Sequence, residues 1–407
     1  MPEATNTSIL AIATIMKNEG PYILEWVAYH RALGVDKIFI ADNDSNDGST
    51  EILKQLNDAG LITYIPFPHV RGEAPQLKAY LKILETYGSE ADWFAFIDAD
   101  EFLSPTDDDK SLVDIMSNVP DDVGAIAVNW AVYGSSFREE PGSGLVLDRF
   151  MNRANQSIDE NKHYKTILRS IAFQAVGKTP HHFDIKPGYK FIYPNGNVVD
   201  YLEKDSFGLS KNAEWSILRL NHYVIKSKKE FFLKKTKRGR ATTFLQPRDI
   251  VFFNCHDRNE VADPLDKRII RRVKDEINKL SGLIKIPPHL ESVETSIAYD
   301  EKQRSKTAGS IDIIKNENGI VNIIGWCVIH GVKADDFTIT IDDEMLKILN
   351  VDRIYRDDVA KLLPGVEPYC GFTILADVSS IEYKNETLLS IKLATMNSEL
   401  ILTRNIH

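Results

Sequence analysis

Cysteine is scarce in this sequence, with three residues in a chain of 407, namely Cys255, Cys327 and Cys370. Their wide spacing includes no CxxC pair, so the sequence contains neither a zinc-binding pattern nor a disulfide framework. We therefore expect the protein to work in the reducing environment of the cytoplasm.

Long hydrophobic runs and an excess of positive charge are missing too. The longest early apolar run, Ile9–Met16, follows no basic leader and is far shorter than the roughly 18 residues that span a membrane. The net charge of −10 argues against a dedicated nucleic-acid binder, and a hydrophobic content of 43% excludes a disordered chain. The composition therefore predicts a globular protein without a nucleic-acid partner.

What is present is an alternation of two periodicities over the first hundred residues. Continuous apolar segments, typical of strands buried on both faces, alternate with segments of helical spacing that end at Gly34, Gly60 and Gly88. The predicted strands cover 8–17, 35–43, 61–68 and 92–100, and the predicted helices cover 18–34, 49–59 and about 73–87. This alternation predicts an α/β fold with a parallel or mixed sheet and helices on both faces.

The pattern changes after Pro105. A predicted strand at 124–134 precedes a loop-rich stretch to about 205, and a strand at 215–225 and helices at 227–239 and 263–280 come next. A proline pair and a polar run mark 284–310 as a linker, and short strands separated by turn residues follow it. We predict an α/β domain at 1–283, this linker, and a small all-β sandwich at 311–407.

Polar side chains follow three of the predicted strands. Asn18 and Glu19 come after the first strand, Asp42 ends the second, and Asp98 and Asp100 end the fourth. Because ligands of parallel sheets bind beyond the carboxyl ends of the strands, we expect these side chains to share one edge of the sheet.

The chemistry of that edge is acidic. The loop after the first strand, KNEGPY, has one glycine and lacks the GxGxxG fingerprint of dinucleotide-binding enzymes. Asp98, Asp100 and Glu101 crowd three carboxylates into four residues, and a divalent cation with oxygen ligands would offset their repulsion. Residues i and i+2 of a strand share a face, so we expect both aspartates to point to one place. The alternative is that D-x-D marks only the turn at the strand end.

The motifs of the first 240 residues carry a resemblance. The segments MKNEGPYILEWVAYHRALGVDKIFIADNDSNDGSTEIL, RGEAPQLKAY and WFAFIDADEFL resemble nucleotide-sugar glycosyltransferases of the family 2 type, above all a bacterial branch related to family 92. The likeness continues in VNWAVYGSS, LVLDRF, YKTILRS, HHF and LNHYVIKSKKEFFLKKTKRG, over about residues 8–240. It implies the GT-A fold, a uridine-type nucleotide-sugar donor, and Mn²⁺ or Mg²⁺.

The resemblance also implies roles for individual residues. Asp42 would accept a hydrogen bond from the base of the donor, Asp98 would contact the ribose or the metal, and Asp100 would bind the metal. Asn18, Glu19, Arg71 and Gln76 would line the donor site. Glu101 would be structural and turned away from the two aspartates, and Glu25, Trp26 and His30 of the E-W-x-x-x-H segment would serve packing.

Further roles follow from the later motifs. His222 in LNHYVIKS matches the histidine that such enzymes give to the metal, although a lone histidine is as often a core residue. Lys165 and Lys226 would support the leaving diphosphate. The basic run from Lys226 to Arg240 would either face solvent or contact a membrane surface, which would put the protein at the inner face of the membrane.

The catalytic base is open at this stage. An inverting transfer needs a carboxylate within reach of the acceptor hydroxyl. Asp184 in HHFDIKPG falls roughly where family 2 enzymes keep theirs, and Glu139 and Glu140 are rivals. The E-D dipeptide usual in the family is missing there.

The segment from 325 to 374 resembles a small β-sandwich appended to many bacterial glycosyltransferases, through G-W, R-x-D-V-A, P-G and C-G-F motifs. The sequence thus predicts a metal-dependent glycosyltransferase that acts on a surface glycan or a lipid-linked acceptor. Two alternatives remain: an inactive carbohydrate-binding or scaffold protein, and a sugar nucleotidyltransferase.

Overall fold

The chain forms two compact units in the computed structural model, Met1–Thr295 and Ser296–His407. The described residues are 8–68, 70, 74–203, 206–234, 248–304, 308–329, 332–333, 336–342, 344–363, 366, 368–379, 381, 387–395 and 398–406. Each unit has its own cluster of buried hydrophobic residues.

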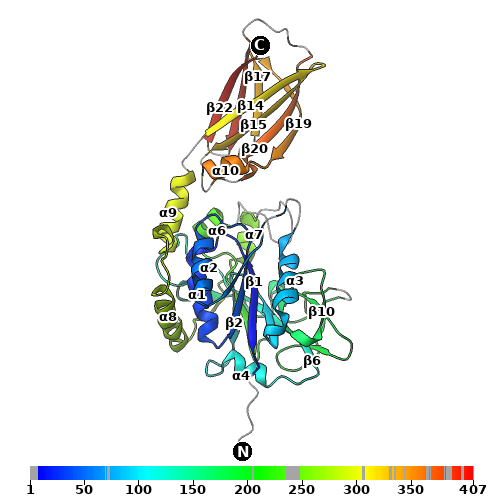
Figure 1. Cartoon of the computed structure of the whole chain (residues 1–407), viewed down its shortest axis with the longest axis vertical. Helices are drawn as coiled ribbons and strands as arrows, with labels where there is room; N and C mark the ends of the chain where they lie inside the picture. Colours follow the sequence, from blue (N-terminus) through cyan, green and yellow to red (C-terminus); the bar gives the residue numbers. More distant parts are fainter. Residues whose placement is uncertain are drawn as a thin grey trace, which may run out of the picture. The chain divides into compact units, whose positions relative to one another are not determined.

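The first half of the first unit consists of strands that alternate with helices. Its elements are β1 (Leu10–Met16), α1 (Gly20–Ala32), β2 (Lys37–Asp42), α2 (Ser49–Asp58), β3 (Thr63–Pro66), α3 (Pro75–Tyr87) and β4 (Trp93–Phe96). The strands lie in the order β3-β2-β1-β4 and are all parallel. In Figure 1, α1 and α2 lie on one side of this sheet and α3 on the other.

The second half extends the same sheet with mixed strand directions. The order continues from β4 through β8 (Tyr164–Arg169), β6 (Val123–Val132) and β12 (Leu218–His222) to β5 (Glu101–Pro105), and β11 (Lys190–Ile192) pairs with β6. Strand β8 is antiparallel to β4 and β6, and β12 is parallel to β6 and antiparallel to β5. The carboxyl ends of β4, β6 and β12 therefore meet the amino ends of β8 and β5 at one edge, here called the rim.

Short elements complete the unit. Small strand pairs are β9 (Phe173–Val176) with β10 (Phe183–Ile185), and β7 (Asn152–Arg153) with β13 (Val261–Ala262). The other helices are α4 (Leu112–Ser117), α5 (Val146–Arg149), α6 (Lys228–Lys234), α7 (Ile250–His256) and α8 (Lys267–Ser281), and 3₁₀ turns cover Gly88–Glu90, Asp159–Lys162, Ser170–Ala172 and Pro288–Leu290. Helix α9 (Val293–Arg304) contains the boundary between the two units. Among the described helices, none is both long and apolar enough to cross a membrane.

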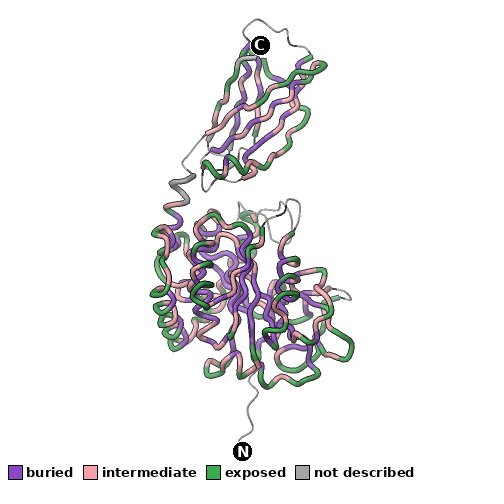
Figure 2. The backbone as a smooth tube through the Cα atoms, viewed as in Figure 1, coloured by how far each residue is buried: buried purple, intermediate pink, exposed green. Residues whose placement is uncertain are grey.

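The core of the first unit explains the apolar runs of the sequence. Strand β1 is buried at six of its seven positions, and Phe94 and Phe96 of β4 pack with Phe39 of β2 and Tyr80 of α3. Figure 2 shows the buried residues concentrated along these central strands. Because helices cover both faces, the strands need apolar side chains in both directions, as the sequence predicted.

The second unit is built of antiparallel strands. One sheet has the order β14-β15-β20-β19, with β16 beside β15, and the other has the order β18-β17-β21-β22. The strands are β14 (Ala308–Glu317), β15 (Ile320–Ile329), β16 (Val332–Lys333), β17 (Asp336–Ile341), β18 (Glu344–Met345), β19 (Lys347–Ile354), β20 (Gly371–Asp377), β21 (Thr387–Thr395) and β22 (Ser398–Ile406), with α10 (Asp357–Leu362) and a 3₁₀ turn at Pro368–Cys370. Side chains of both sheets share one buried cluster.

The predicted fold class is therefore confirmed: a mixed α/β sheet with helices, followed by antiparallel β-sheets. Several element boundaries differ from the prediction. The helix expected at 263–280 begins at Lys267, because the Asp266 side chain caps it by accepting from the Arg268 N–H, and Asp263 lies outside the helix and forms ion pairs. The segment expected as a linker, 284–310, contains a 3₁₀ turn, α9 and the start of β14.

Part of that segment packs on the first unit. The Leu290 side chain, buried to 4% exposure, lies against Gly20 and Gly48, where an added Cβ would come within 2.6 and 2.9 Å of the leucine. His289 Nε2 donates to the carbonyl oxygen of Asp47 at 2.7 Å. The two loops that follow β1 and β2 are thus braced by residues some 240 positions later, which local sequence patterns did not indicate.

We expect Leu290→Ala to lower the free energy of unfolding by about 2–4 kcal/mol, because it leaves a cavity between two closely packed glycines. Leu283→Ala is the matched control, since Leu283 is 62% exposed and its truncation should change stability by less than about 0.5 kcal/mol. Urea unfolding of the full chain measures both values. Equal values for the two variants would contradict the bracing role.

Candidate active site

The D-x-D motif lies in a turn rather than in a strand. Asp98 and Asp100 fall between the end of β4 and the start of β5, and the Glu101 N–H donates to the Asp98 carbonyl oxygen at 3.1 Å. The expectation that both side chains share a strand face is therefore wrong, because the alternation of a strand does not hold within a turn. The two carboxylates have different partners.

Asp98 is held by residues of two other elements. Its Oδ1 accepts from Gln76 Nε2 of α3 at 2.6 Å and forms an ion pair with Lys165 Nζ of β8 at 2.8 Å. Burial would raise the pKa of the Asp98 carboxyl, but the Lys165 ammonium outweighs burial and lowers this pKa below its ordinary value. Gln76 and Lys165 were both predicted to contact the donor. In this structure they fix Asp98 at the rim.

Glu101 completes the group around Lys165. It is fully buried, its Oε2 accepts from the Asp98 N–H at 2.7 Å, and the same oxygen lies 3.7 Å from Lys165 Nζ. Burial raises the pKa of the Glu101 carboxyl to about 8, although Lys165 opposes the rise. Its Oε1 has no hydrogen-bond partner among the described residues. The side chain therefore binds the backbone of Asp98, whereas the resemblance implied that it turns away from the two aspartates.

Asp100 faces His222. The distance from Asp100 Oδ1 to His222 Nε2 is 3.6 Å, and both side chains are buried. Burial lowers the pKa of His222, so the imidazole is neutral near pH 7. Its Nδ1 makes no hydrogen bond within the described part of the chain. By contrast, both ring nitrogens of His30 are used: Nδ1 donates to the Trp26 carbonyl oxygen, and Nε2 accepts from the Leu103 N–H.

The strand register explains why these side chains meet. Lys165 is paired with Val128, His222 with Val132, and Glu101 with His222. Paired residues of adjacent strands point to the same face of a sheet, and residues two apart in one strand do so too. Lys165, Trp130, His222 and Glu101 therefore share one face at the rim. The sequence motifs assign no role to Trp130. Its position two residues before the end of β6 places it at the rim, but this follows only once the register of β6 with its neighbours is known.

The E-W-x-x-x-H segment of α1 supports this edge. Strand β5 is the last strand of the sheet, and Trp26 Nε1 donates to the Glu101 carbonyl oxygen at 2.9 Å while His30 accepts from Leu103. Glu25 accepts from the Val146 and Leu147 N–H groups at the start of α5. All three residues thus satisfy backbone groups, which agrees with the packing role expected for them.

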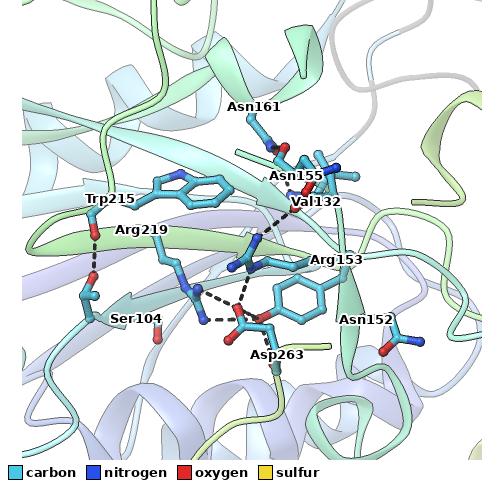
Figure 3. A network of polar contacts seen from close by, with 12 residues as sticks. Ser104, Val132, Asn152, Arg153, Asn155, Asn161, Trp215, Arg219 and Asp263 are labelled. Atoms are coloured by element: carbon cyan, nitrogen blue, oxygen red, sulfur yellow. Dashed lines mark hydrogen bonds and ion pairs between the residues drawn. The ribbon is translucent and has the colours of Figure 1, made fainter. Parts of the chain in front are cut away.

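The opposite side of β12 is fixed by an ion-pair network (Figure 3). The Asp263 carboxylate pairs with Arg153 Nε at 2.5 Å and with Arg219 Nη1 at 2.6 Å, and it accepts from the Tyr133 hydroxyl at 3.2 Å. Arg219 belongs to β12 and Arg153 to β7. Asp263 therefore ties the strand that carries His222 to its surroundings.

The loops after β1 and β2 bind each other. The Asn18 N–H donates to Ser45 Oγ at 3.0 Å, and the Asn18 side chain exchanges two 2.8 Å hydrogen bonds with Asn46. Asp42 accepts from the Ser45 N–H at 3.2 Å and from the Thr50 hydroxyl at 2.5 Å. In this structure, Asp42 organises the loop into α2, and its predicted contact with a nucleotide base remains a prediction.

Glu19 and Lys226 line one small pocket with Tyr22, Ile225, Glu230 and Lys234. Lys226 has a positive φ of 59°, and its Nζ lies 4.5 Å from the centre of the Tyr22 ring. The Lys234 Nζ lies 4.9 Å from the same ring. Two ammonium groups therefore flank one aromatic ring near the amino end of α1.

The candidate bases are more exposed. Asp184 on β10 is 54% exposed, and its Oδ1 lies 4.0 Å from His182 Nε2. Glu139 and Glu140 are exposed and form ion pairs with Lys228 and Lys229 at 3.2 and 3.3 Å. Arg71, predicted to contact the donor, lies outside the described residues. The assignment of the base therefore remains a prediction.

The residues around Asp98 and Asp100 belong to a segment with known relatives. The profile of glycosyltransferase family 92 matches residues 8–244, which is more than half of the chain. A family 92 protein of Oryza sativa subsp. japonica is 28% identical over 189 residues, which are 45% of this chain and 31% of the relative. One of Arabidopsis thaliana is 28% identical over 191 residues, 44% of this chain and 32% of the relative.

The curated relatives match this chain over only part of their own length. The chain spans about a third of the length of the curated relatives that it matches. They are plant proteins, so they give no support to the bacterial branch inferred from the motifs. Among solved structures, S. aureus TarS in complex with UDP-GlcNAc is 9% identical, covers 77% of this chain and 96% of that chain, and has a TM-score of 0.30.

We expect Glu101→Gln to stabilise the unliganded protein at alkaline pH. Folding raises the pKa of this carboxyl, so its protonated form favours the folded state below the unfolded pKa of about 4.5, and that contribution is lost as the pH rises toward about 8. The variant has no such proton to lose and should exceed the wild type by more than about 1 kcal/mol at pH 8.5, a difference that shrinks toward pH 5.

Urea unfolding across pH measures this difference, and Glu139→Gln is the matched control because Glu139 is 74% exposed. Parallel stability curves for the wild type and Glu101→Gln would show that Glu101 is ionised in the folded protein.

Proposed function

Because the chain belongs to glycosyltransferase family 92, we propose that it transfers a sugar from a uridine-type nucleotide-diphosphate donor to a hydroxyl group of a glycan or lipid-linked acceptor. The observation that carries the proposal is the Asp100–His222 pair beside the Asp98–Lys165 ion pair, at the rim of the sheet. Intact acidic residues at this rim favour an enzyme over an inactive binding protein.

Asp100 and His222 fit a divalent cation as two of its ligands. A carboxylate oxygen and a neutral imidazole nitrogen 3.6 Å apart are suitably spaced for two adjacent ligands of one ion after a small adjustment. An imidazole ligand favours Mn²⁺ over Mg²⁺, which prefers oxygen. When bound, the ion would neutralise charge on the leaving diphosphate. No group of three or more ligating side chains occurs in the described residues, so donor oxygens and water would complete the shell.

Asp98 contributes differently. Its Oδ1 is engaged by Gln76 and Lys165, which leaves Asp100 as the carboxylate directed at His222. This arrangement supports a contact of Asp98 with the ribose rather than with the cation. Both lysines are buried, but Lys165 is ion-paired to Asp98 whereas Lys226 lines the pocket beside Glu19, so Lys226 is the better candidate to meet the diphosphate.

The reaction itself is a displacement at the anomeric carbon. The acceptor oxygen forms a bond to C1 of the sugar, the bond from C1 to the diphosphate oxygen breaks, and the nucleoside diphosphate leaves with the electron pair. The acceptor proton passes to a carboxylate on the opposite side of the sugar, for which Asp184 is the candidate and Glu139 and Glu140 are rivals. One displacement of this kind inverts the configuration at C1.

The nucleoside would lie at the loops after β1 and β2. Asn18, Glu19 and Asp42 lie there, and the mutual hydrogen bonds of these loops give a rigid support for a base and ribose. A cytoplasmic protein with a basic segment from Lys226 to Arg240 would meet lipid-linked acceptors at the inner face of the membrane; residues 235–240 of that segment lie outside the described part.

We expect UDP to bind much more tightly with Mn²⁺ than without it. Asp100→Asn should weaken UDP binding in Mn²⁺ by about tenfold or more, because the amide removes a charged ligand, and His222→Ala should weaken it less, because water can replace one neutral ligand. Isothermal titration calorimetry measures these affinities.

The matched control is Asp121→Asn, since Asp121 is fully exposed and should leave UDP affinity unchanged. Circular dichroism checks the fold of each variant. Equal UDP affinity with and without Mn²⁺ in the wild type would refute the metal-dependent donor site.

A further inference from the structure

We propose that Trp130, with His163 and His181, forms a stacking platform for a pyranose ring of the acceptor. This inference rests on the proposed function, because it names a subsite of the same rim. It concerns three side chains to which neither the sequence motifs nor the metal site gave a role.

The three rings form one group around the indole. The ring centre of Trp130 lies 4.7 Å from that of His163, with an interplanar angle of 32°, and 5.4 Å from that of His181. The rings of His163 and His181 are 5.6 Å apart. The platform also touches the site, because Trp130 lies 4.3 Å from the ring of His222, which faces Asp100.

Exposure separates this group from the structural tryptophans. Trp26 and Trp93 are fully buried, whereas Trp130, His163 and His181 are only half-buried. The indole N–H of Trp130 is buried and, like that of Trp93, makes no hydrogen bond within the described part of the chain, so it is the partly exposed ring that sets Trp130 apart. A partly exposed aromatic ring suits the apolar face of a sugar.

The order of strands favours the acceptor over the nucleoside. The loops proposed for the nucleoside follow β1 and β2, and the D-x-D turn follows β4. Trp130 lies on β6 and His163 just before β8, on the other side of β4 from β1 and β2. With the diphosphate near Asp100, a ring stacked on Trp130 would lie on the side of the transferred sugar and the acceptor.

The chemistry of the three side chains suits a sugar. The C–H groups of a pyranose face are attracted to the negative face of an aromatic ring, as positively polarised ring edges are. Burial lowers the pKa of His163 to about 4 and that of His181 to about 3, so both imidazoles are neutral near pH 7. Neutral imidazoles can both donate to and accept from hydroxyl groups. The platform would therefore bind an uncharged sugar ring.

The test uses the full-length protein with UDP and Mn²⁺, and saturation-transfer NMR with three probes: methyl β-D-glucopyranoside, methyl β-D-galactopyranoside and methyl α-D-mannopyranoside. Acyclic glucitol, which has hydroxyl groups but no ring face, is the negative probe. We expect saturation of the ring protons of at least one pyranoside. Trp130→Leu should weaken its binding by about tenfold, and Trp130→Phe, which keeps an aromatic face, by about threefold or less.

Trp326→Leu is the matched control, because Trp326 is also half-buried but belongs to the second unit, and it should leave the signal unchanged. His163→Ala keeps the test decisive if Trp130→Leu does not fold, since loss of its ring should also weaken pyranoside binding. Thermal unfolding reports the fold of each variant.

Pyranoside binding that is equal in the wild type and Trp130→Leu, or absent from the wild type, would overturn the platform. UDP titration of the same samples separates this outcome from failure of the proposed function. Absence of UDP binding refutes the donor site, whereas retained UDP binding with pyranoside binding lost in Trp130→Leu supports the platform.

Discussion

One buried ammonium group makes the acidic rim possible. Asp98, Asp100 and Glu101 would repel one another, but Lys165 lies 2.8 Å from Asp98 and 3.7 Å from Glu101 within the sheet itself. Lys165 keeps Asp98 ionised, while burial favours a proton on Glu101. Asp100 lies beside this group, 3.6 Å from the neutral imidazole of His222. The proposed cation would bind between these two side chains.

Distant parts of the chain hold this rim in shape. Trp26 and His30 of α1 satisfy the outer backbone groups of the edge strand β5, and Asp263 anchors β12 through Arg219. Leu290 closes over the glycines of the first two loops. These contacts join segments that lie up to about 270 residues apart, so the site depends on the fold of the entire first unit rather than on the D-x-D motif alone.

The sequence predicted the fold class and the sharing of one edge by the polar strand ends, because both follow from local periodicity. It left open whether the D-x-D motif lies in the strand or in a turn, and it did not predict that a second strand, β5, starts directly after the turn, since the apolar run continues on both sides. Nor did it reveal that Gln76 and Lys165 hold Asp98, that Asp263 pairs with two arginines, or that Leu290 packs on Gly20. Each of these depends on which elements meet in space, and a single sequence contains no signal for that. Only the strand register shows that Trp130 lies on the same face as Lys165 and His222.

The central claim is that Asp100 and His222 together hold a divalent cation on which a nucleoside diphosphate binds. A crystal structure with Mn²⁺ and UDP, with an anomalous difference map recorded at the manganese edge, tests it most directly. The account predicts one anomalous peak about 2.0–2.3 Å from an Asp100 carboxylate oxygen and from His222 Nε2, with diphosphate oxygens in its shell. Bound UDP without a peak at these two residues, or with manganese held elsewhere, would contradict it.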